Sequence, residues 1–262
     1  MKCIILAAGY ATRMYPLTLN FPKPLLEVGG KPILDWLCSD LFSCGVDQIY
    51  VVTNHKFYLN FDQWAQTKSK VVVLDDGTST NETRLGALKD IAFVLDSIED
   101  GKSSKALAKE DFFILAGDNV LDFSFKAFFA YAHKKNASCV MRHYQGDLER
   151  LRRTGVCEID SNDRLLSMEE KPKEPKSNWA VPPFYYYKGE DLALLPEAIA
   201  SGLSVDAPGS FVSYLATRRP VYAFPMNGHR FDVGTIEGYE KLKVSYKGIC
   251  NSWLDNSCLS EQ

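Results

Sequence analysis

The first residues that could do chemistry lie near the amino terminus. Residues 4–6 form an apolar run typical of a buried strand, and the small residues 7–9 (Ala-Ala-Gly) allow the backbone N–H groups to turn toward an anion. Arg13 and Lys23 follow, one a planar fork of donors and the other a compact ammonium. Because two such cations flank one loop, the stretch 4–33 predicts a binding site for a polyphosphate.

Three later segments add carboxylates and another cation. Asp118 directly follows the apolar run 111–117, Glu170 is followed by Lys171, and Asp232 stands within the sequence Phe-Asp-Val-Gly-Thr. An isolated Asp after a strand is more often a turn or helix-capping residue than a ligand. The functional interpretation of these residues therefore depends on their occurring together.

Five motifs occur in order along the chain: LAAGYATRMYPLT, PKPLLEVGGKPI, Gly-Asp-Asn at 117–119, Glu-Lys-Pro at 170–172 and Phe-Asp-Val-Gly-Thr at 231–235. In this order they resemble the sugar-1-phosphate nucleotidyltransferases, in particular the short glucose-1-phosphate thymidylyltransferase-like members, over nearly the whole chain. The resemblance implies that a phosphate oxygen of a sugar 1-phosphate attacks the α-phosphorus of an NTP, giving an NDP-sugar and pyrophosphate. Such chemistry depends mainly on positioning and charge neutralisation.

The resemblance also assigns the residues of the nucleotide side. It makes Arg13 the arginine on the pyrophosphate side and Lys23 the lysine on the α-phosphate, and it makes Asp118 and Asp232 the carboxylates that hold Mg²⁺, a cation that prefers oxygen ligands. The short, single-domain relatives favour a pyrimidine base. The expected nucleotide-binding residues are Leu6, Ala7, Gly9, Thr83 and Gly86.

On the acceptor side, the resemblance implies that Glu170 binds sugar hydroxyls, that Lys171 binds the sugar phosphate and that the backbone of Gly155 approaches the sugar. The chain departs from the family at 181–184 (Val-Pro-Pro-Phe), where relatives usually have glycine. Proline cannot donate an N–H, so we expect acceptor recognition to differ, and a phosphorylated small alcohol becomes conceivable as the acceptor. Ala11 also replaces a common glycine, and we expect its φ to be negative.

These residues need strands and helices to position them. Apolar runs and helical spacing predict an α/β fold, and the resemblance implies a three-layer α/β/α Rossmann-like arrangement with a mixed, mostly parallel central sheet. One nucleotidyltransferase domain is expected at 1–249, with its acceptor-binding part roughly at 138–230, and a polar tail at 250–262. The expected strands are 4–6, 48–53, 71–74, 111–117, 138–143, 156–159, 164–171 and 221–224. The expected helices begin at Ile33 and cover 33–42, 85–95, 123–135, 190–199, 210–217 and 235–246.

Composition limits the partners. With 262 residues, 46% of them hydrophobic, and a net charge of -3, the chain can bury one large core and offers no basic surface for nucleic acid or an anionic membrane. Its seven cysteines are scattered without paired spacing, which favours reduced core thiols over zinc ligands or disulfides. No segment resembles a signal peptide or a membrane span, so we expect a cytoplasmic protein. A homo-oligomer remains open.

Other functions fit less well. The dinucleotide fingerprint GxGxxG is absent because Tyr10 and Ala11 follow Gly9, and Asp96 stands where a P-loop before Gly101-Lys102-Ser103 needs glycine. A glycosyltransferase would be expected to have a second acidic residue beside Asp118. The chain ends soon after Tyr246, so we expect no appended acyltransferase or regulatory domain. Two alternatives stay open: a cytidylyltransferase acting on a non-sugar phosphorylated alcohol, and a non-catalytic sugar-nucleotide-binding regulator.

Overall fold

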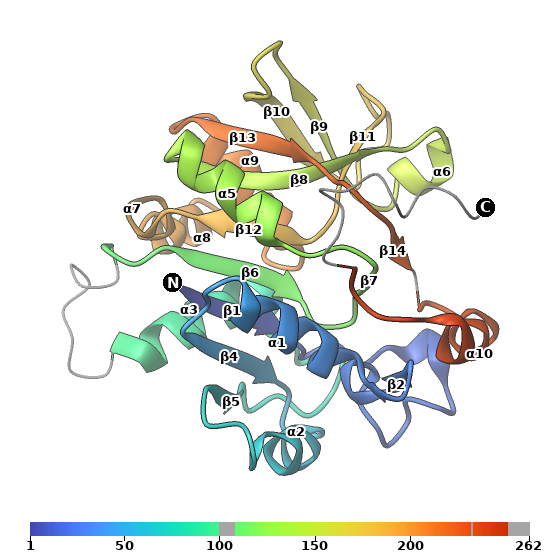
Figure 1. The fold of residues 1–262 in the computed structure, drawn as a ribbon. Helices are drawn as coiled ribbons and strands as arrows, with labels where there is room; N and C mark the ends of the chain where they lie inside the picture. Colours follow the sequence, from blue (N-terminus) through green and yellow to red (C-terminus); the bar gives the residue numbers. More distant parts are fainter. Residues whose placement is uncertain (100–107, 232, 251–262) are drawn as a thin grey trace.

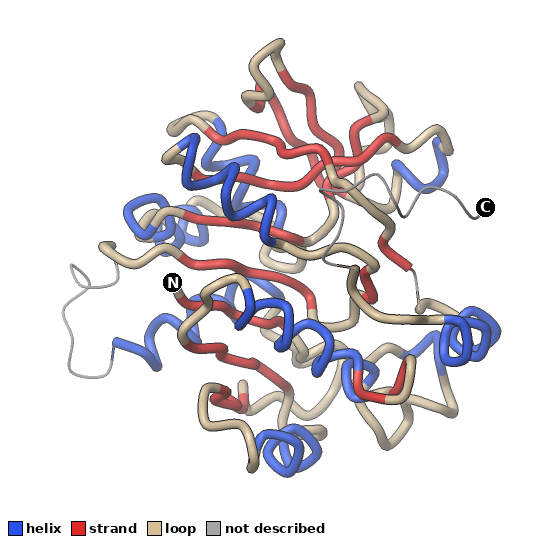
Figure 2. Tube along the Cα trace, in the orientation of Figure 1, coloured by secondary structure: helices blue, strands red, loops and turns tan. Residues whose placement is uncertain are grey.

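The computed structural model describes residues 1–99, 108–231 and 233–250. Within these ranges, a ten-stranded mixed sheet runs through the molecule, and helices cover both of its faces (Figures 1 and 2). This arrangement confirms the predicted three-layer α/β fold with a mixed central sheet. The same residues contain no helix long and apolar enough to cross a membrane.

The sheet is continuous across both halves of the molecule. Side by side, its strands are β10 (Leu165–Glu170), β9 (Gly155–Ile159), β11 (Trp179–Val181), β8 (Ser138–Tyr144), β12 (Phe184–Tyr187), β6 (Phe112–Ala116), β1 (Lys2–Leu6), β4 (Gln48–Thr53) and β5 (Val71–Asp75), with β13 (Val221–Pro225) also paired to β8. Two short antiparallel pairs are β14 (Arg230–Phe231) with β7 (Val120–Leu121), and β2 (Glu27–Val28) with β3 (Lys31–Pro32).

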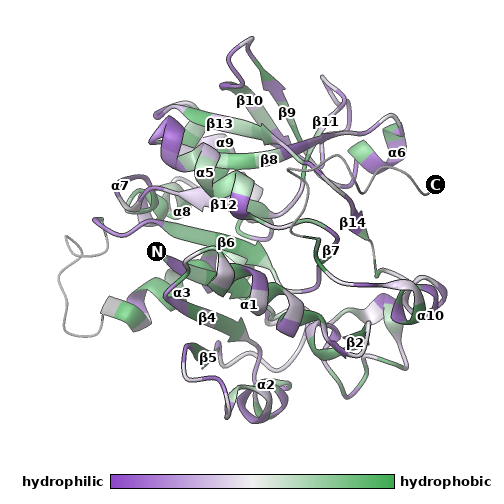
Figure 3. Ribbon diagram, in the orientation of Figure 1, coloured by the Kyte–Doolittle hydropathy of each residue, from purple (hydrophilic) through white to green (hydrophobic). Residues whose placement is uncertain are grey.

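Strand β1 is at the centre of the parallel half. It pairs in parallel with β4 on one side and with β6 on the other, and β5 continues this half beyond β4. These strands are largely hydrophobic in Figure 3, as expected of strands covered on both faces. Because parallel strands end at the same edge of a sheet, the residues after Leu6, Thr53 and Ala116 all emerge at that edge.

The other half of the sheet is largely antiparallel. Among the described residues, the sheet has four parallel pairings and five antiparallel ones, but of its ten strands only β10, β11 and β12 run opposite to the other seven, as predicted for a mixed, mostly parallel sheet. Apolar runs identify buried strands but carry no direction, which depends on connections made at a distance. Pro182 and Pro183 interrupt the aromatic segment 179–188, so it forms two strands, β11 and β12.

Helices on the two faces enclose separate apolar layers. One layer receives α1 (Ile33–Ser43), α2 (Tyr58–Ala65), α5 (Lys126–Lys135) and α10 (Ile236–Ser245). The other receives α3 (Ala87–Glu99), α7 (Gly189–Leu192), α8 (Leu195–Ala200) and α9 (Gly209–Ala216). The small helix α6 (Leu148–Leu151) packs separately, through Leu151, against Val156 and Ala180.

Most expected helices and strands are present, with a few differences. The helix expected at 190–199 is divided into α7 and α8. The short helices α2 and α6 were not predicted, and each of them buries a single residue, Phe61 and Leu151. Four of the cysteines are buried thiols, as expected: Cys3, Cys38, Cys139 and Cys157. Most of the polar tail expected at 250–262 lies outside the described residues.

Candidate functional site

The predicted phosphate loop leaves β1 and is anchored to the neighbouring strand. The N–H of Ala7 donates to the carbonyl of Val52 at 2.8 Å, and the side-chain amide of Asn54 donates to the carbonyl of Ala8 at 2.9 Å. Gly9 is exposed, and a Cβ added there would meet nothing within 4 Å. The hydrogen bonds to Val52 and from Asn54 therefore fix the loop, and the space beside Gly9 is open, so the backbone there can approach a ligand.

Ala11 has a left-handed backbone, with φ 46° and ψ 41°. The expectation of a negative φ was wrong. The carbonyl of Ala11 accepts hydrogen bonds from the N–H of Met14 at 3.0 Å and from the hydroxyl of Thr18 at 2.9 Å. These two bonds hold the turn that leads into the 3₁₀ turn η1 (Thr12–Met14), which carries Arg13. The loop thus keeps a conformation that costs an alanine free energy.

A cavity of about 260 Å³ opens at this edge of the sheet. It brings together six residues predicted from the sequence: Leu6, Ala7, Gly9, Arg13, Lys23 and Asp118. Six further residues complete its lining: Ala11, Met14, Pro24, Ala116, Val233 and Gly234. The cavity is therefore lined by apolar side chains and backbone groups together with the cations Arg13 and Lys23 and the carboxylate of Asp118.

Lys23 and Asp118 form an ion pair within this cavity. The Nζ of Lys23, on the 3₁₀ turn η2 (Lys23–Leu25), lies 2.8 Å from Oδ2 of Asp118, which follows β6. Lys23 is only 8% exposed, whereas 45% of the Asp118 side chain is exposed. Burial acts to raise the pKa of Asp118, but Lys23 and Arg230 outweigh it and hold this pKa below its usual value. Asp118 is therefore ionised at neutral pH.

The expected magnesium site includes one described carboxylate. Asp118 offers hard oxygen ligands at the cavity, whereas Asp232 lies outside the described residues. Among the residues that the structure describes, no group of three or more His, Cys, Asp or Glu side chains could hold a metal ion. Mg²⁺ is commonly bound by one or two carboxylates together with substrate phosphates, so an ionised Asp118 beside a phosphate cavity fits this cation.

The predicted acceptor residues meet on the antiparallel half. Gly155 of β9 is paired in register with Glu170 of β10, and a Cβ on Gly155 would lie 3.2 Å from Oε1 of Glu170. Lys171 is exposed, has a φ of 49°, and its N–H donates to the carbonyl of Thr154 at 3.0 Å. The structure therefore brings Gly155, Glu170 and Lys171 together, away from the cavity that holds Lys23.

Glu170 has a further neighbour that sequence reasoning missed. The N–H of Gly209, at the start of α9, donates a hydrogen bond to the Glu170 carboxylate. Burial raises the pKa of Glu170, while Lys171 and this N–H partly oppose the rise. A Cβ on residue 209 would collide with Oε1 of Glu170. Glycine at 209 is thus what allows the helix to approach this carboxylate.

Thr83 and Gly86 are not brought to the cavity. Thr83 is exposed, and its hydroxyl donates to the carbonyl of Thr80 at 3.1 Å within a turn. Gly86 has a φ of 89°, and a Cβ there would lie 2.9 Å from the carbonyl oxygen of Val205. Close packing and a left-handed backbone therefore account for Gly86, and the contact of both residues with nucleotide stays a prediction.

Arg230 and Asn119 also went unrecognised in the sequence. Nη1 of Arg230 donates to Oδ1 of Asn119 at 3.0 Å, and Arg230 contributes to lowering the pKa of Asp118. Their only sequence signal was position, since Asn119 follows Asp118 and Arg230 stands two residues before Asp232.

Similarity to known proteins establishes the family to which this chain belongs. A family model described as nucleotidyl transferase matches residues 2–247. The chain belongs to the nucleotidyl transferase family. A relative named mannose-1-phosphate guanyltransferase, from Sulfolobus acidocaldarius, is 30% identical over 247 residues. That match covers 93% of this chain and 62% of the relative, so this nucleotidyl transferase spans less than two thirds of the relative's length.

Solved structures share the fold of this nucleotidyl transferase. A Bacillus anthracis structure named as a glucose-1-phosphate thymidylyltransferase in complex with a sucrose superposes with a TM-score of 0.77 at 20% identity, covering 97% of this chain and 99% of the other. A UDP-glucose pyrophosphorylase complexed with UDP-glucose gives a TM-score of 0.74 at 20% identity, with coverages of 94% and 97%. At this identity, the likeness establishes the fold.

Proposed function

We propose that this nucleotidyl transferase is an Mg²⁺-dependent enzyme that transfers NMP from an NTP to a sugar 1-phosphate. A phosphate oxygen of the acceptor forms a new bond to the α-phosphorus, the bond from that phosphorus to the bridging oxygen breaks, and pyrophosphate leaves. The observation that carries the proposal is the Lys23–Asp118 ion pair in a cavity that also contains Arg13.

The donor side of the reaction is assigned to this cavity. Arg13 and Lys23 are cations of different shape, and both line it, so they can contact separate phosphates of one triphosphate. Mg²⁺ held by Asp118 and Asp232 would neutralise further phosphate charge and orient the α-phosphate. Since Lys23 already touches Asp118, a bound phosphate would have its cation and its metal carboxylate side by side.

The acceptor side is assigned to the region around Gly155 and Glu170. The half-buried carboxylate of Glu170 can accept hydrogen bonds from sugar hydroxyls, and the glycine at 155 allows Glu170 and Met168 to pack closely against the β9 backbone. Lys171, exposed next to Glu170, supplies a cation for the acceptor phosphate. The nucleotide and the acceptor are then held by different halves of the sheet, and the reaction occurs where these halves meet.

One feature favours testing a second class of acceptor. Pro182 and Pro183 lie between β11 and β12, so this connection offers no N–H donor at either residue. The N–H of Phe184 donates instead to the carbonyl of Pro182 at 2.7 Å. A sugar that accepts a hydrogen bond from a backbone N–H at this position would lose that bond. A small phosphorylated alcohol does not depend on it.

A matrix of pyrophosphate-release assays tests the function. It pairs dTTP, UTP, CTP, GTP and ATP with hexose 1-phosphates and with phosphorylated alcohols, with Mg²⁺ or with EDTA. The names of the relatives include guanine, thymine and uracil nucleotides, so the base is determined by the matrix, in which a pyrimidine is our prediction. Magnesium-dependent release with one hexose 1-phosphate supports the proposal. Release with alcohols alone favours the second class, and no release with any pair contradicts both.

A further inference from the structure

Arg230 lies where the two halves of the sheet meet. It belongs to β14, which pairs with β7 so that Arg230 stands opposite Leu121 (Figure 1). Strand β7 begins directly after Asp118 and Asn119. This pairing brings a cation from late in the chain to the carboxyl end of β6, beside the ionised Asp118.

Among the described residues, the guanidinium of Arg230 has one hydrogen-bond partner. Its Nη1 donates to Oδ1 of Asn119 at 3.0 Å, and the amide nitrogen of Asn119 donates to the carbonyl of Ala116 at 2.7 Å. Asn119 is 2% exposed, so it is a fixed support, whereas Arg230 is exposed. A guanidinium carries five N–H donors, and the described residues provide Arg230 with no other hydrogen-bond partner.

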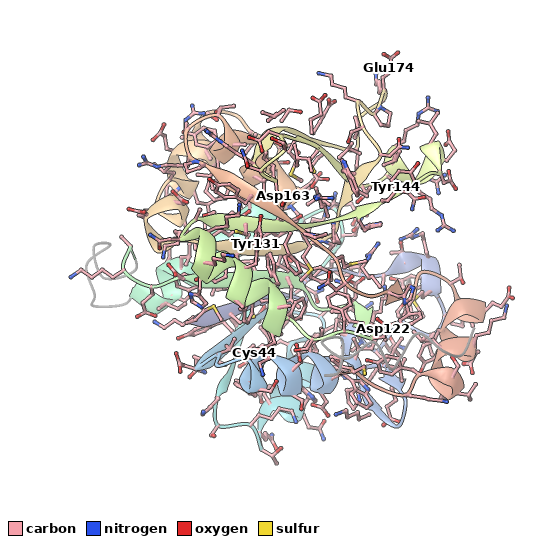
Figure 4. The ribbon with its side chains drawn as sticks, turned by 45° about the horizontal axis from the view of Figure 1, so that its top comes forward. Cys44, Asp122, Tyr131, Tyr144, Asp163 and Glu174 are labelled. Atoms are coloured by element: carbon pink, nitrogen blue, oxygen red, sulfur yellow. The ribbon has the colours of Figure 1, made fainter. Side chains whose placement is uncertain are left out.

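Arg142 has a structural role, and its contacts provide a comparison for those of Arg230. Its Nη2 lies 2.6 Å from Oδ1 of Asp163, its Nε donates to the carbonyl of Ala223 at 3.3 Å, and its guanidinium carbon lies 4.2 Å above the ring of Trp179. Asp163 is labelled in Figure 4, in the turn between β9 and β10. Arg142 is thus paired with a carboxylate and stacked on a ring, and Arg230 has neither partner among the described residues.

Titratable groups from both halves of the sheet lie within electrostatic range of Arg230. Besides Asp118 it acts electrostatically on His143 of β8 and on Tyr185 of β12. Glu170, the predicted acceptor carboxylate, acts on the same Tyr185. Arg230 does not line the cavity that contains Arg13 and Lys23. Its hydrogen bond to Asn119 therefore holds Arg230 next to Asp118 but outside the lining of the cavity that contains the donor cations.

We propose that Arg230 binds the phosphate group of the acceptor and that Asn119 positions it. An open planar fork matches two oxygens of a phosphate, and binding from this side would present the remaining oxygen toward the α-phosphorus. The neighbouring Asp118 draws Arg230 toward the reacting centre, while Asn119 prevents it from closing onto that carboxylate. The inference rests on the proposed function, since it adds a second cation, besides Lys171, that contacts the phosphate of that acceptor.

Kinetics of Arg230→Gln and Arg230→Lys test this assignment with the acceptor and nucleotide that the wild-type enzyme uses. A lost charge-assisted contact predicts a rise of about tenfold to a hundredfold in the KM for the acceptor, with the KM for the NTP nearly unchanged. Arg230→Lys keeps the charge and should recover part of the loss. Asn119→Ala should give a smaller change in the same direction, because it removes the support and not the contact.

Arg219→Gln is the matched control. Arg219 is half exposed, pairs with Asp191 at 3.5 Å and precedes β13, whereas Arg230 follows that strand's other end. Its removal should leave both KM values unchanged. If Arg230→Gln instead raises the KM for the NTP alone, or leaves both KM values at the wild-type level, the assignment is wrong while the proposed function stands.

A binding measurement keeps the inference testable without turnover. Glucose 1-phosphate, mannose 1-phosphate and glucose are each added to the wild type and to Arg230→Gln, and the shift in Tm is recorded. A shift with a hexose 1-phosphate but not with glucose, reduced in Arg230→Gln, supports phosphate binding by Arg230. Equal shifts in both proteins, or no shift in the wild type with either phosphate, overturn it. Failure of the proposed function itself would appear separately, as an inactive wild type in the assay matrix.

Discussion

The ammonium of Lys23 and the carboxylate of Asp118 are 2.8 Å apart, although 95 positions separate the two residues in the chain. Lys23 begins a 3₁₀ turn and stands between two prolines, and Asp118 follows the buried strand β6, so both are attached to ordered parts of the fold. The pair therefore fixes a cation beside a carboxylate before substrate arrives. Such preorganisation reduces the cost of stabilising charge that develops during phosphoryl transfer.

Lys23→Ala should reduce the kcat of pyrophosphate release by at least about a hundredfold, because a positioned cation on the α-phosphate is lost. Asp118→Asn should cause a comparable loss, since the amide binds Mg²⁺ weakly and no longer attracts Lys23. Circular dichroism should show an unchanged fold in both variants. Lys241→Ala is the control, because this exposed lysine pairs with Glu237 on α10 and has no other ion pair among the described residues. Normal turnover in purified Lys23→Ala would rule out the mechanism.

Asp90, on α3, predicts an unusual dependence of stability on pH. It is 6% exposed, and burial, followed by the charge of Asp76, raises its pKa to about 7. Oδ1 of Asp90 and Oδ2 of Asp76 have no hydrogen-bond partner within the described part of the chain. A carboxyl whose pKa is raised by folding stabilises the fold fully below its unfolded value, near 3.8, and loses that contribution as the pH rises to about 7.

Asp90→Asn should therefore be more stable than the wild type at pH 8, by up to about 4 kcal/mol in the free energy of unfolding. Near pH 4 the two proteins should be almost equally stable, because Asp90 is then protonated. Urea denaturation at the two pH values measures this. Asp62→Asn, at an exposed position on α2, should show no such difference between pH values. A wild type that is the more stable protein at pH 8 would contradict the assigned environment of Asp90.

The residues proposed for the donor side, which the structure brings to one cavity, could be selected from the sequence because their determinants are local. The apolar strand β1, the small residues after it and the position of Asp118 after β6 can all be recognised in short windows. The acceptor side depends on contacts between distant segments. Nothing near Gly209 indicates that its N–H meets Glu170, and nothing near Arg230 indicates Asn119 as its support.

Gly209→Ala tests whether the approach of α9 holds Glu170 in place. The added Cβ would collide with Oε1 of Glu170 and would also lie 2.6 Å from Cε of Met168, so the carboxylate must move. We expect a rise of about tenfold in the KM for the acceptor, an unchanged KM for the NTP, and a loss of stability of about 1–3 kcal/mol from overpacking. In Gly146→Ala, the control, the new Cβ would meet Tyr144 at an ordinary 3.6 Å. Equal KM values in the wild type and Gly209→Ala would show that Glu170 does not depend on this contact.

Ala11→Gly should stabilise the protein, because Ala11 has a φ of 46°. A left-handed backbone costs an alanine about 1–2 kcal/mol, and Ala11→Gly removes this cost. Glycine has greater freedom in the unfolded chain, which offsets part of the gain, so the expected net stabilisation is about 0.5–1 kcal/mol. Urea denaturation should show a higher midpoint with an unchanged slope. Ala65→Gly, at the end of α2, should have the opposite sign, since glycine disfavours a helix. If Ala11→Gly lowers the midpoint as Ala65→Gly does, then the hydrogen bonds from Met14 and Thr18 do not hold Ala11 in a strained conformation.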